Sequence, residues 1–195
     1  MPNATRNATK PLPKPPDEAS LREGALAHLA RFAATRAGLA RVLNRRIDRW
    51  ARAAELAGLE AEAIAAAVRA ARAAVPAVVA ALSAVGAIDD AAFADGRARR
   101  LIRQGKSRRA TLAHLVDKGV EAVLAETVVP EDPARDLAAA CAYLRRRRLP
   151  PFGPGERVRA LAALARGGFT RDIAERAVDL DPDEADAALS ALRRS

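Results

Sequence analysis

The residues that could carry out catalysis are few and scattered in this sequence. Its two histidines, His28 and His114, lie far apart, and neither belongs to an HExxH-like metal motif. The single cysteine, Cys141, lies on the apolar stripe of an expected helix, where a packing thiol is more common than a nucleophile. Asp89 and Asp90 are adjacent carboxylates, but a place at the start of a helix explains both. We therefore predict a protein that is not an enzyme and that uses no metal and no cofactor.

Clusters of arginine are the strongest chemical signal. No acidic residue occurs between Asp95 and Asp117, and a run of four arginines ends a later helix. One or two cations would balance the negative end of a helix, whereas four adjacent ones also repel one another. Because guanidinium groups bind phosphate and carboxylate through paired hydrogen bonds, both clusters favour an anionic partner. The expected contact residues are Arg97, Arg100, Arg103, Lys106, Arg108, Arg109, Arg145, Arg146, Arg147 and Arg148.

A third basic group falls on one face of an earlier expected helix. It consists of Arg41, Arg45, Arg46, Arg49 and Arg52. A solvated helix face explains this spacing as well as a binding role does. Aromatic residues make up only 3% of the chain, which disfavours a surface that stacks nucleic-acid bases. The anionic partners that these clusters still favour are DNA phosphate and an acidic protein groove.

The overall charge and the cysteine content limit the partners and the compartment. The net charge is +9, which favours nucleic acid, an acidic protein face or a membrane surface as partner. A single cysteine excludes an internal disulfide and suits a reducing compartment. The N-terminus has no apolar core of a secretory signal, and the longest uncharged stretch, residues 73–88, is short for a membrane span. We expect a cytoplasmic protein that does not enter a membrane.

The composition predicts an all-α fold. Hydrophobic residues make up 50% of the chain, and alanine, a strong helix former, is the commonest of them. Ser20 with Glu23 fits a capping box, Thr35 fits the N-cap of a helix that runs to about Leu56, and Pro76 predicts a break or kink. Further helices are expected from Asp89 to Gly105, from Ser107 to Gly119, and over residues 121–127, 134–147, 156–166, 170–178 and 183–193.

A repeated helix ending predicts three stacked three-helix units. Leu115 precedes Gly119-Val120 and Leu164 precedes Gly168-Phe169 at the same spacing, and Leu43 with Ile47 is a weaker third instance. Such units would form an elongated, curved array. The expected division is a disordered, basic, proline-rich tail (1–19), an extended first repeat (20–87), a second repeat (88–129) and a third repeat with a C-terminal helix (130–195).

The segment 88–120 resembles the RecX family of recombination regulators. It opens with Ile-Asp-Asp-Ala-Ala-Phe-Ala, passes through Gly-Lys-Ser-Arg-Arg at 105–109 and closes with Lys-Gly-Val at 118–120. The resemblance covers roughly residues 21–178, although Ile47 stands where the family pattern places glycine.

The resemblance implies a monomer of tandem three-helix repeats that lies along the RecA–DNA filament. It would modulate, and most often inhibit, the ATPase, recombinase and co-protease activities of RecA in DNA repair and the SOS response. Direct contact with single- or double-stranded DNA through phosphate is also implied. The alternative is a basic helical protein that binds DNA independently of RecA.

Overall fold

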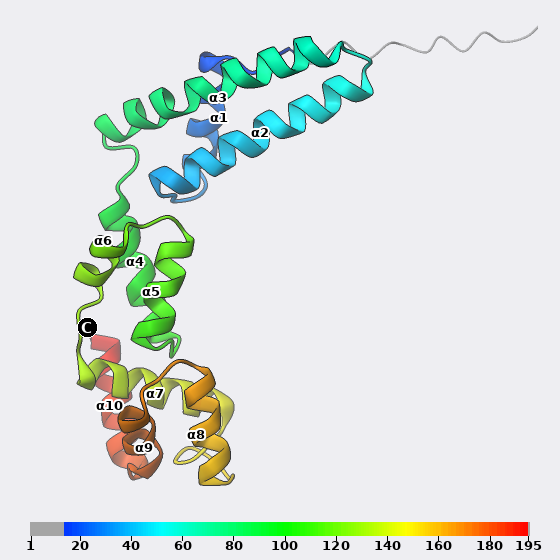
Figure 1. Ribbon diagram of the computed structural model, residues 1–195. Helices are drawn as coiled ribbons and strands as arrows, with labels where there is room; N and C mark the ends of the chain where they lie inside the picture. Colours follow the sequence, from blue (N-terminus) through cyan, green and yellow to red (C-terminus); the bar gives the residue numbers. More distant parts are fainter. Residues whose placement is uncertain (1–13, 195) are drawn as a thin grey trace, which may run out of the picture. The chain divides into compact units, whose positions relative to one another are not determined.

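The computed structural model describes residues 14–194, and these form ten α-helices and no strand (Figure 1). The predicted all-α fold is therefore confirmed. The helices are α1 (Glu18–Leu29), α2 (Arg36–Leu56), α3 (Ala61–Ala84), α4 (Asp90–Arg103), α5 (Arg108–Asp117), α6 (Ala122–Val128), α7 (Pro133–Arg147), α8 (Arg157–Arg166), α9 (Arg171–Asp179) and α10 (Pro182–Arg194). They divide into two compact units, Met1–Ile88 and Asp89–Ser195.

Helix α1 begins earlier than the sequence suggested. Asp17 is its N-cap: the Asp17 carboxylate accepts from the Ser20 N–H at 2.8 Å, and the Asp17 N–H donates to the Ser20 hydroxyl at 3.1 Å. Ser20 is thus the third helical residue of a capping box and not the cap, so the expected box of Ser20 with Glu23 is wrong. Most of the predicted tail, residues 1–13, lies outside the described residues.

The first unit is a long α2–α3 hairpin with α1 packed against both helices (Figure 1). Thr35 caps α2 as predicted, because its hydroxyl accepts from the Gly38 N–H at 2.9 Å. Ile47 is fully buried in the middle of α2, so its comparison with the helix-ending glycines is wrong. The matching turn lies further along, where the Leu59 N–H donates to the Ala54 carbonyl at 3.1 Å. The second helix of this unit, α2, therefore continues well past Ile47 and is longer than the corresponding helices of the second unit.

Helix α3 runs without a break through Pro76, so of the predicted break or kink the break is wrong. A proline removes one backbone hydrogen bond, and here the apolar side chains on both sides of it hold the helix in the core. Val75, Val78 and Leu82 are buried against the other two helices. By length and composition alone, α3 is also long and apolar enough to cross a membrane, and 28% of that apolar window is buried within the fold.

The second unit contains two successive three-helix groups, α4–α6 and α7–α9, followed by α10. Helix α4 packs against α5 and α6, and α7 packs against α8, α9 and α10. Both groups share one continuous core, since α4 also contacts α7 and residues from Ala94 to Leu192 belong to the same buried cluster. The predicted helix endings are present: Val120 N–H donates to the Leu115 carbonyl at 3.0 Å, and Phe169 N–H donates to the Leu164 carbonyl at 3.2 Å.

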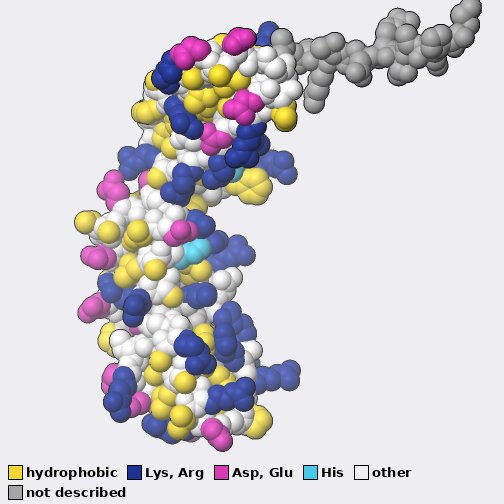
Figure 2. Space-filling model, turned by 45° about the vertical axis from the view of Figure 1, so that its right-hand side comes forward, with side chains coloured by type: hydrophobic (Ala, Val, Ile, Leu, Met, Phe, Trp, Pro, Cys, Tyr) yellow, Lys and Arg dark blue, Asp and Glu magenta, His cyan; other side chains and the backbone are white. Residues whose placement is uncertain are grey.

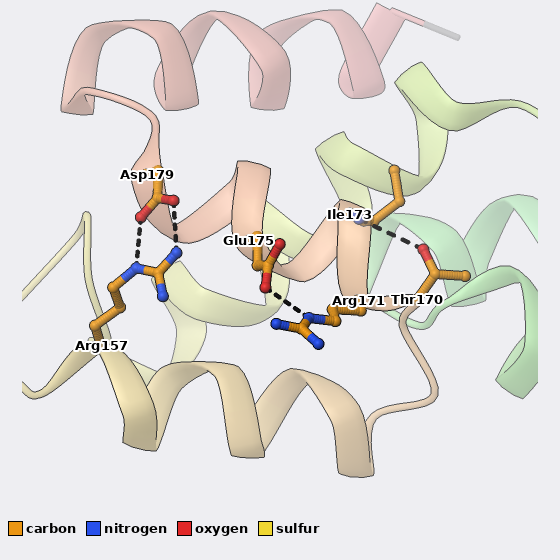
Figure 3. A network of polar contacts seen from close by, with 6 residues as sticks. All are labelled: Arg157, Thr170, Arg171, Ile173, Glu175 and Asp179. Atoms are coloured by element: carbon orange, nitrogen blue, oxygen red, sulfur yellow. Dashed lines mark hydrogen bonds and ion pairs between the residues drawn. The ribbon is translucent and has the colours of Figure 1, made fainter.

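A polar network on the surface joins α8 to α9 (Figure 3). The Arg157 guanidinium donates to both carboxylate oxygens of Asp179, at 2.8 and 2.7 Å, and this fork lowers the pKa of Asp179. Along α9, Arg171 pairs with Glu175 at 2.7 Å. Because these groups are solvent-exposed, the pairs fix orientation more than they stabilise the fold.

Candidate functional site

A close backbone contact brings the end of α4 onto α7. Gly105 follows α4 with φ of +72°, a conformation that side chains disfavour. A Cβ atom there would lie 2.6 Å from the Tyr143 nitrogen and 3.0 Å from the Ala139 carbonyl oxygen of α7. Only glycine leaves room for this approach. The ends of α4 and α7, which carry the two predicted basic clusters, therefore lie near each other.

The next residues fix the start of α5. The Ser107 hydroxyl is buried, accepts from the Ala110 N–H at 3.2 Å as an N-cap, and donates to the Gly167 carbonyl at 2.8 Å. It therefore ties the α4–α5 joint to the turn between α8 and α9. The basic joint is a rigid part of the second unit.

Arg108 is largely engaged in internal contacts. Its Nε donates to the Val129 carbonyl at 2.9 Å, its backbone N–H donates to the Asp136 carboxylate at 2.9 Å, and its guanidinium lies 3.8 Å from Glu131. Burial raises the pKa of Asp136, and the hydrogen bond from Arg108 opposes this rise. Arg108 thus holds α5 to the α6–α7 connection.

Arg97 is also paired within the fold. Its Nε donates to His114 Nε2 at 2.9 Å, so His114 accepts as the neutral ring. Partial burial and then the positive charge of Arg97 lower the pKa of His114. His114 is half-buried.

The four consecutive arginines at the end of α7 have different contacts. Arg145 pairs with Asp186 of α10 at 2.9 Å, and the Arg147 guanidinium lies 4.5 Å from the centre of the Tyr143 ring. Arg148 ends α7 in the left-handed conformation, with φ of +52°. Arg146 is exposed and has no ionic or hydrogen-bonded partner among the described residues.

The predicted cations that keep their charge available to a partner form a smaller set. The side chains of these exposed residues make no hydrogen bond, ion pair or ring contact within residues 14–194: Arg100, Arg103, Lys106, Arg109, Arg146 and Arg148. Lys and Arg side chains gather along one side of the second unit, to the right in Figure 2, and most Asp and Glu side chains visible there lie on the other side. This asymmetry gives the second unit a basic side.

A groove of about 400 Å³ joins parts of both basic clusters. Arg103 and Gln104 of α4 line it together with Arg145 and Arg146 of α7. Sequence reasoning missed Gln104 and also missed Asp186, which lies 41 residues from its partner Arg145. A pairing over such a distance leaves no local sequence signal.

The other candidate chemical groups have structural roles. The Asp89 carboxylate accepts from the N–H groups of Ala91 and Ala92, both at 2.9 Å, as the predicted N-cap of α4. Cys141 is buried, and burial raises the pKa of its thiol to about 11, so the nucleophilic thiolate is suppressed at neutral pH. No group of three or more metal-ligating side chains occurs in the part of the chain that is described.

The third basic group belongs to the first unit. Its five arginines are exposed along α2, and the Arg46 side chain lies beside Gly24 of α1. The arrangement agrees with a solvated helix face.

Comparison with known proteins shows sequence similarity to regulatory proteins of bacteria. The chain is 38% identical to the regulatory protein RecX of Myxococcus xanthus over 183 residues, which cover 87% of this chain and 91% of that protein. It is 34% identical to the regulatory protein RecX of Agrobacterium fabrum over 109 residues, 53% of this chain and 58% of that protein. The crystal structure of RecX from Lactobacillus salivarius is 13% identical with a TM-score of 0.47, covering 92% and 98% of the two chains. No family model matches the chain.

Proposed function

This chain belongs to the RecX family of regulatory proteins, and we propose that it regulates the RecA recombinase by binding the RecA–DNA filament. The expected effect is inhibition of the ATPase, recombinase and co-protease activities in DNA repair and the SOS response. The protein would act in the cytoplasm as a monomer, through binding and not through catalysis.

The basic side of the second unit supports this proposal most strongly. Six exposed cations of the second unit have side chains without internal partners, and Gly105 and Ser107 fix the framework at the joint between α4 and α5. Charges that are free in the isolated protein need not break internal ion pairs before they meet a carboxylate or a phosphate. A filament offers many such groups in a regular row, so weak single contacts add up.

The proposal predicts an effect below equal stoichiometry. We expect the single-strand-dependent ATPase of RecA to fall when the protein is added at a small fraction of the RecA concentration, because one bound molecule affects several filament subunits. The measurement is a titration of ATP hydrolysis at fixed RecA and DNA. The Arg159→Glu variant, changed at an exposed cation of α8, serves as a control and should inhibit RecA as strongly as the unchanged protein does. An ATPase that stays constant up to equal stoichiometry would contradict the proposal.

The same cations also favour a second function, binding to DNA without RecA. Arginine is suited to phosphate contacts, and such contacts release counterions. For duplex DNA the logarithm of the affinity would fall with the logarithm of the salt concentration with a slope of about −0.9 for each phosphate contacted. Tight, steeply salt-dependent binding to bare DNA together with an unchanged RecA ATPase would favour this function over the first.

A further inference from the structure

We propose that the groove between the ends of α4 and α7 and helix α10 binds an acidic protein segment that carries an apolar side chain. We call it the α10 groove, and the residues that line it are Arg103, Gln104, Ala142, Arg145, Arg146, Leu189 and Leu192. The inference rests on the proposed function only in that the segment would belong to the regulated partner.

The rim of the α10 groove is positively charged. Arg103 comes from the last turn of α4, and Arg145 and Arg146 come from the last turn of α7. No acidic residue lines the groove. Three guanidinium groups on one rim, two of them without an internal partner, match carboxylate groups by charge and by geometry.

The floor of the α10 groove is apolar. It is formed by Ala142 of α7 and by Leu189 and Leu192 of α10. Its volume of about 400 Å³ lies toward the lower end of the range of ligand sites, which hold roughly 300–1,000 Å³. The groove therefore offers an apolar surface beside three cationic side chains. A ligand that uses both parts must carry carboxylates next to an apolar side chain.

This combination favours protein over nucleic acid. Single-stranded nucleic acid gains affinity by stacking bases on aromatic side chains, and the α10 groove has no aromatic lining. Phosphate contacts alone would make no use of Leu189 and Leu192. An amphipathic acidic peptide uses the whole groove, with its apolar side chain as the anchor and its carboxylates on the rim.

Asp186 shows how such a carboxylate is held. It projects from α10 and pairs with Arg145 at 2.9 Å, while 58% of its side chain remains exposed. This internal carboxylate stands beside the groove in the way the carboxylates of a bound segment would. Asp186 also competes with a bound carboxylate for Arg145. In the free protein it therefore neutralises part of the positive charge of the groove. Removing the Asp186 charge should therefore tighten binding.

The test measures fluorescence anisotropy of a labelled short peptide in which Asp and Glu residues surround one central Leu, with the full chain as receptor. The double variant Arg103→Glu, Arg146→Glu should weaken binding at least about tenfold, since both side chains are exposed and unpaired. Asp186→Asn should strengthen binding by roughly threefold. The double variant Arg159→Glu, Arg166→Glu, with the same charge change at two exposed residues of α8, should bind within about twofold of the unchanged protein.

Two further probes define the outcomes that would overturn the inference. A peptide with Ser in place of the central Leu should bind at least about fivefold more weakly, because it leaves the apolar floor unfilled. Equal affinity for the two peptides would show that the apolar floor takes no part in binding. A duplex oligonucleotide that binds more tightly than the peptide, with the same dependence on Arg103 and Arg146, would make the groove a nucleic-acid contact instead.

The result can be separated from the proposed function by running the RecA ATPase titration on the same variants. If the protein inhibits RecA but the peptide does not bind, the inference about the groove fails and the proposed function stands. If the peptide binds as described while RecA is unaffected, the groove is supported and the proposed partner is wrong.

Discussion

Gly105→Ala is expected to lower the free energy of unfolding of the second unit by about 2–5 kcal/mol, from left-handed backbone strain and from overpacking. Residue 105 has φ of +72°, and a methyl group there would meet the Tyr143 nitrogen at 2.6 Å and its Cα at 2.9 Å. These neighbours are backbone atoms of α7, which cannot rotate away as a side chain can. Relief requires α4 to withdraw from α7, which opens the shared core.

The chain offers a matched control and a separate signal for each unit. Gly96 lies within α4, and a Cβ added to it would have no atom within 4 Å, so Gly96→Ala should be neutral or stabilising by up to about 1 kcal/mol. Trp50, the single tryptophan, lies in the first unit, and its fluorescence should keep the same midpoint in Gly105→Ala. Far-ultraviolet circular dichroism in urea reports both units. Equal stability of the two alanine variants would contradict the close contact between α4 and α7.

Arg108→Glu is expected to destabilise the second unit by about 2–4 kcal/mol, because it removes the partly buried hydrogen bond to the Val129 carbonyl, leaves that acceptor unpaired and places a carboxylate among acidic residues. The new carboxylate would face the Val129 carbonyl and stand close to Glu131 and Asp136, in place of a guanidinium that is only 28% exposed. Like charges and an unmet acceptor would then lie together at the α6–α7 connection.

The neighbouring residue gives the contrast. Arg109 is exposed and has no partner among residues 14–194, so Arg109→Glu should change the free energy of unfolding by less than about 0.5 kcal/mol. Urea unfolding of the two variants under the same conditions measures the difference. A stable Arg108→Glu protein would show that its internal contacts contribute little. Binding experiments should therefore reverse Arg109 and leave Arg108 intact, since unfolding would imitate loss of binding.

Local sequence signals locate the helix ends of the second unit well. Asp89, Ser107 and Thr170 are expected as caps or helix starts, and each one accepts from backbone N–H groups of the following turn. These signals are reliable because the cap and the groups that it satisfies lie within three residues of each other. The two glycine endings, at Gly119 and Gly168, depend on equally local hydrogen bonds.

The errors arise where distant residues decide the structure. Pro76 predicts a break or kink, and the helix does not break there because packing of Val75 and Leu82 against other helices outweighs one lost hydrogen bond. Ile47 imitates a repeat position in spacing, although its side chain lies in the core of the first unit. The charge pattern of the sequence also does not distinguish arginines that make internal contacts from arginines that are free to bind a partner. Arg108 contacts residues 21 and 28 positions away, and Arg145 contacts one 41 positions away.

We propose that the basic side of the second unit docks the protein on the RecA filament. The most direct measurement is the affinity of the labelled full chain for a RecA filament assembled on single-stranded DNA, compared with the variant Arg100→Glu, Arg103→Glu, Arg109→Glu, Arg146→Glu. All four side chains are exposed and unpaired within the described chain, so the variant should fold normally. We predict filament binding at least about a hundredfold weaker for the variant, from the combined loss of several charge contacts. Equal affinity of the two proteins at moderate salt would contradict the account.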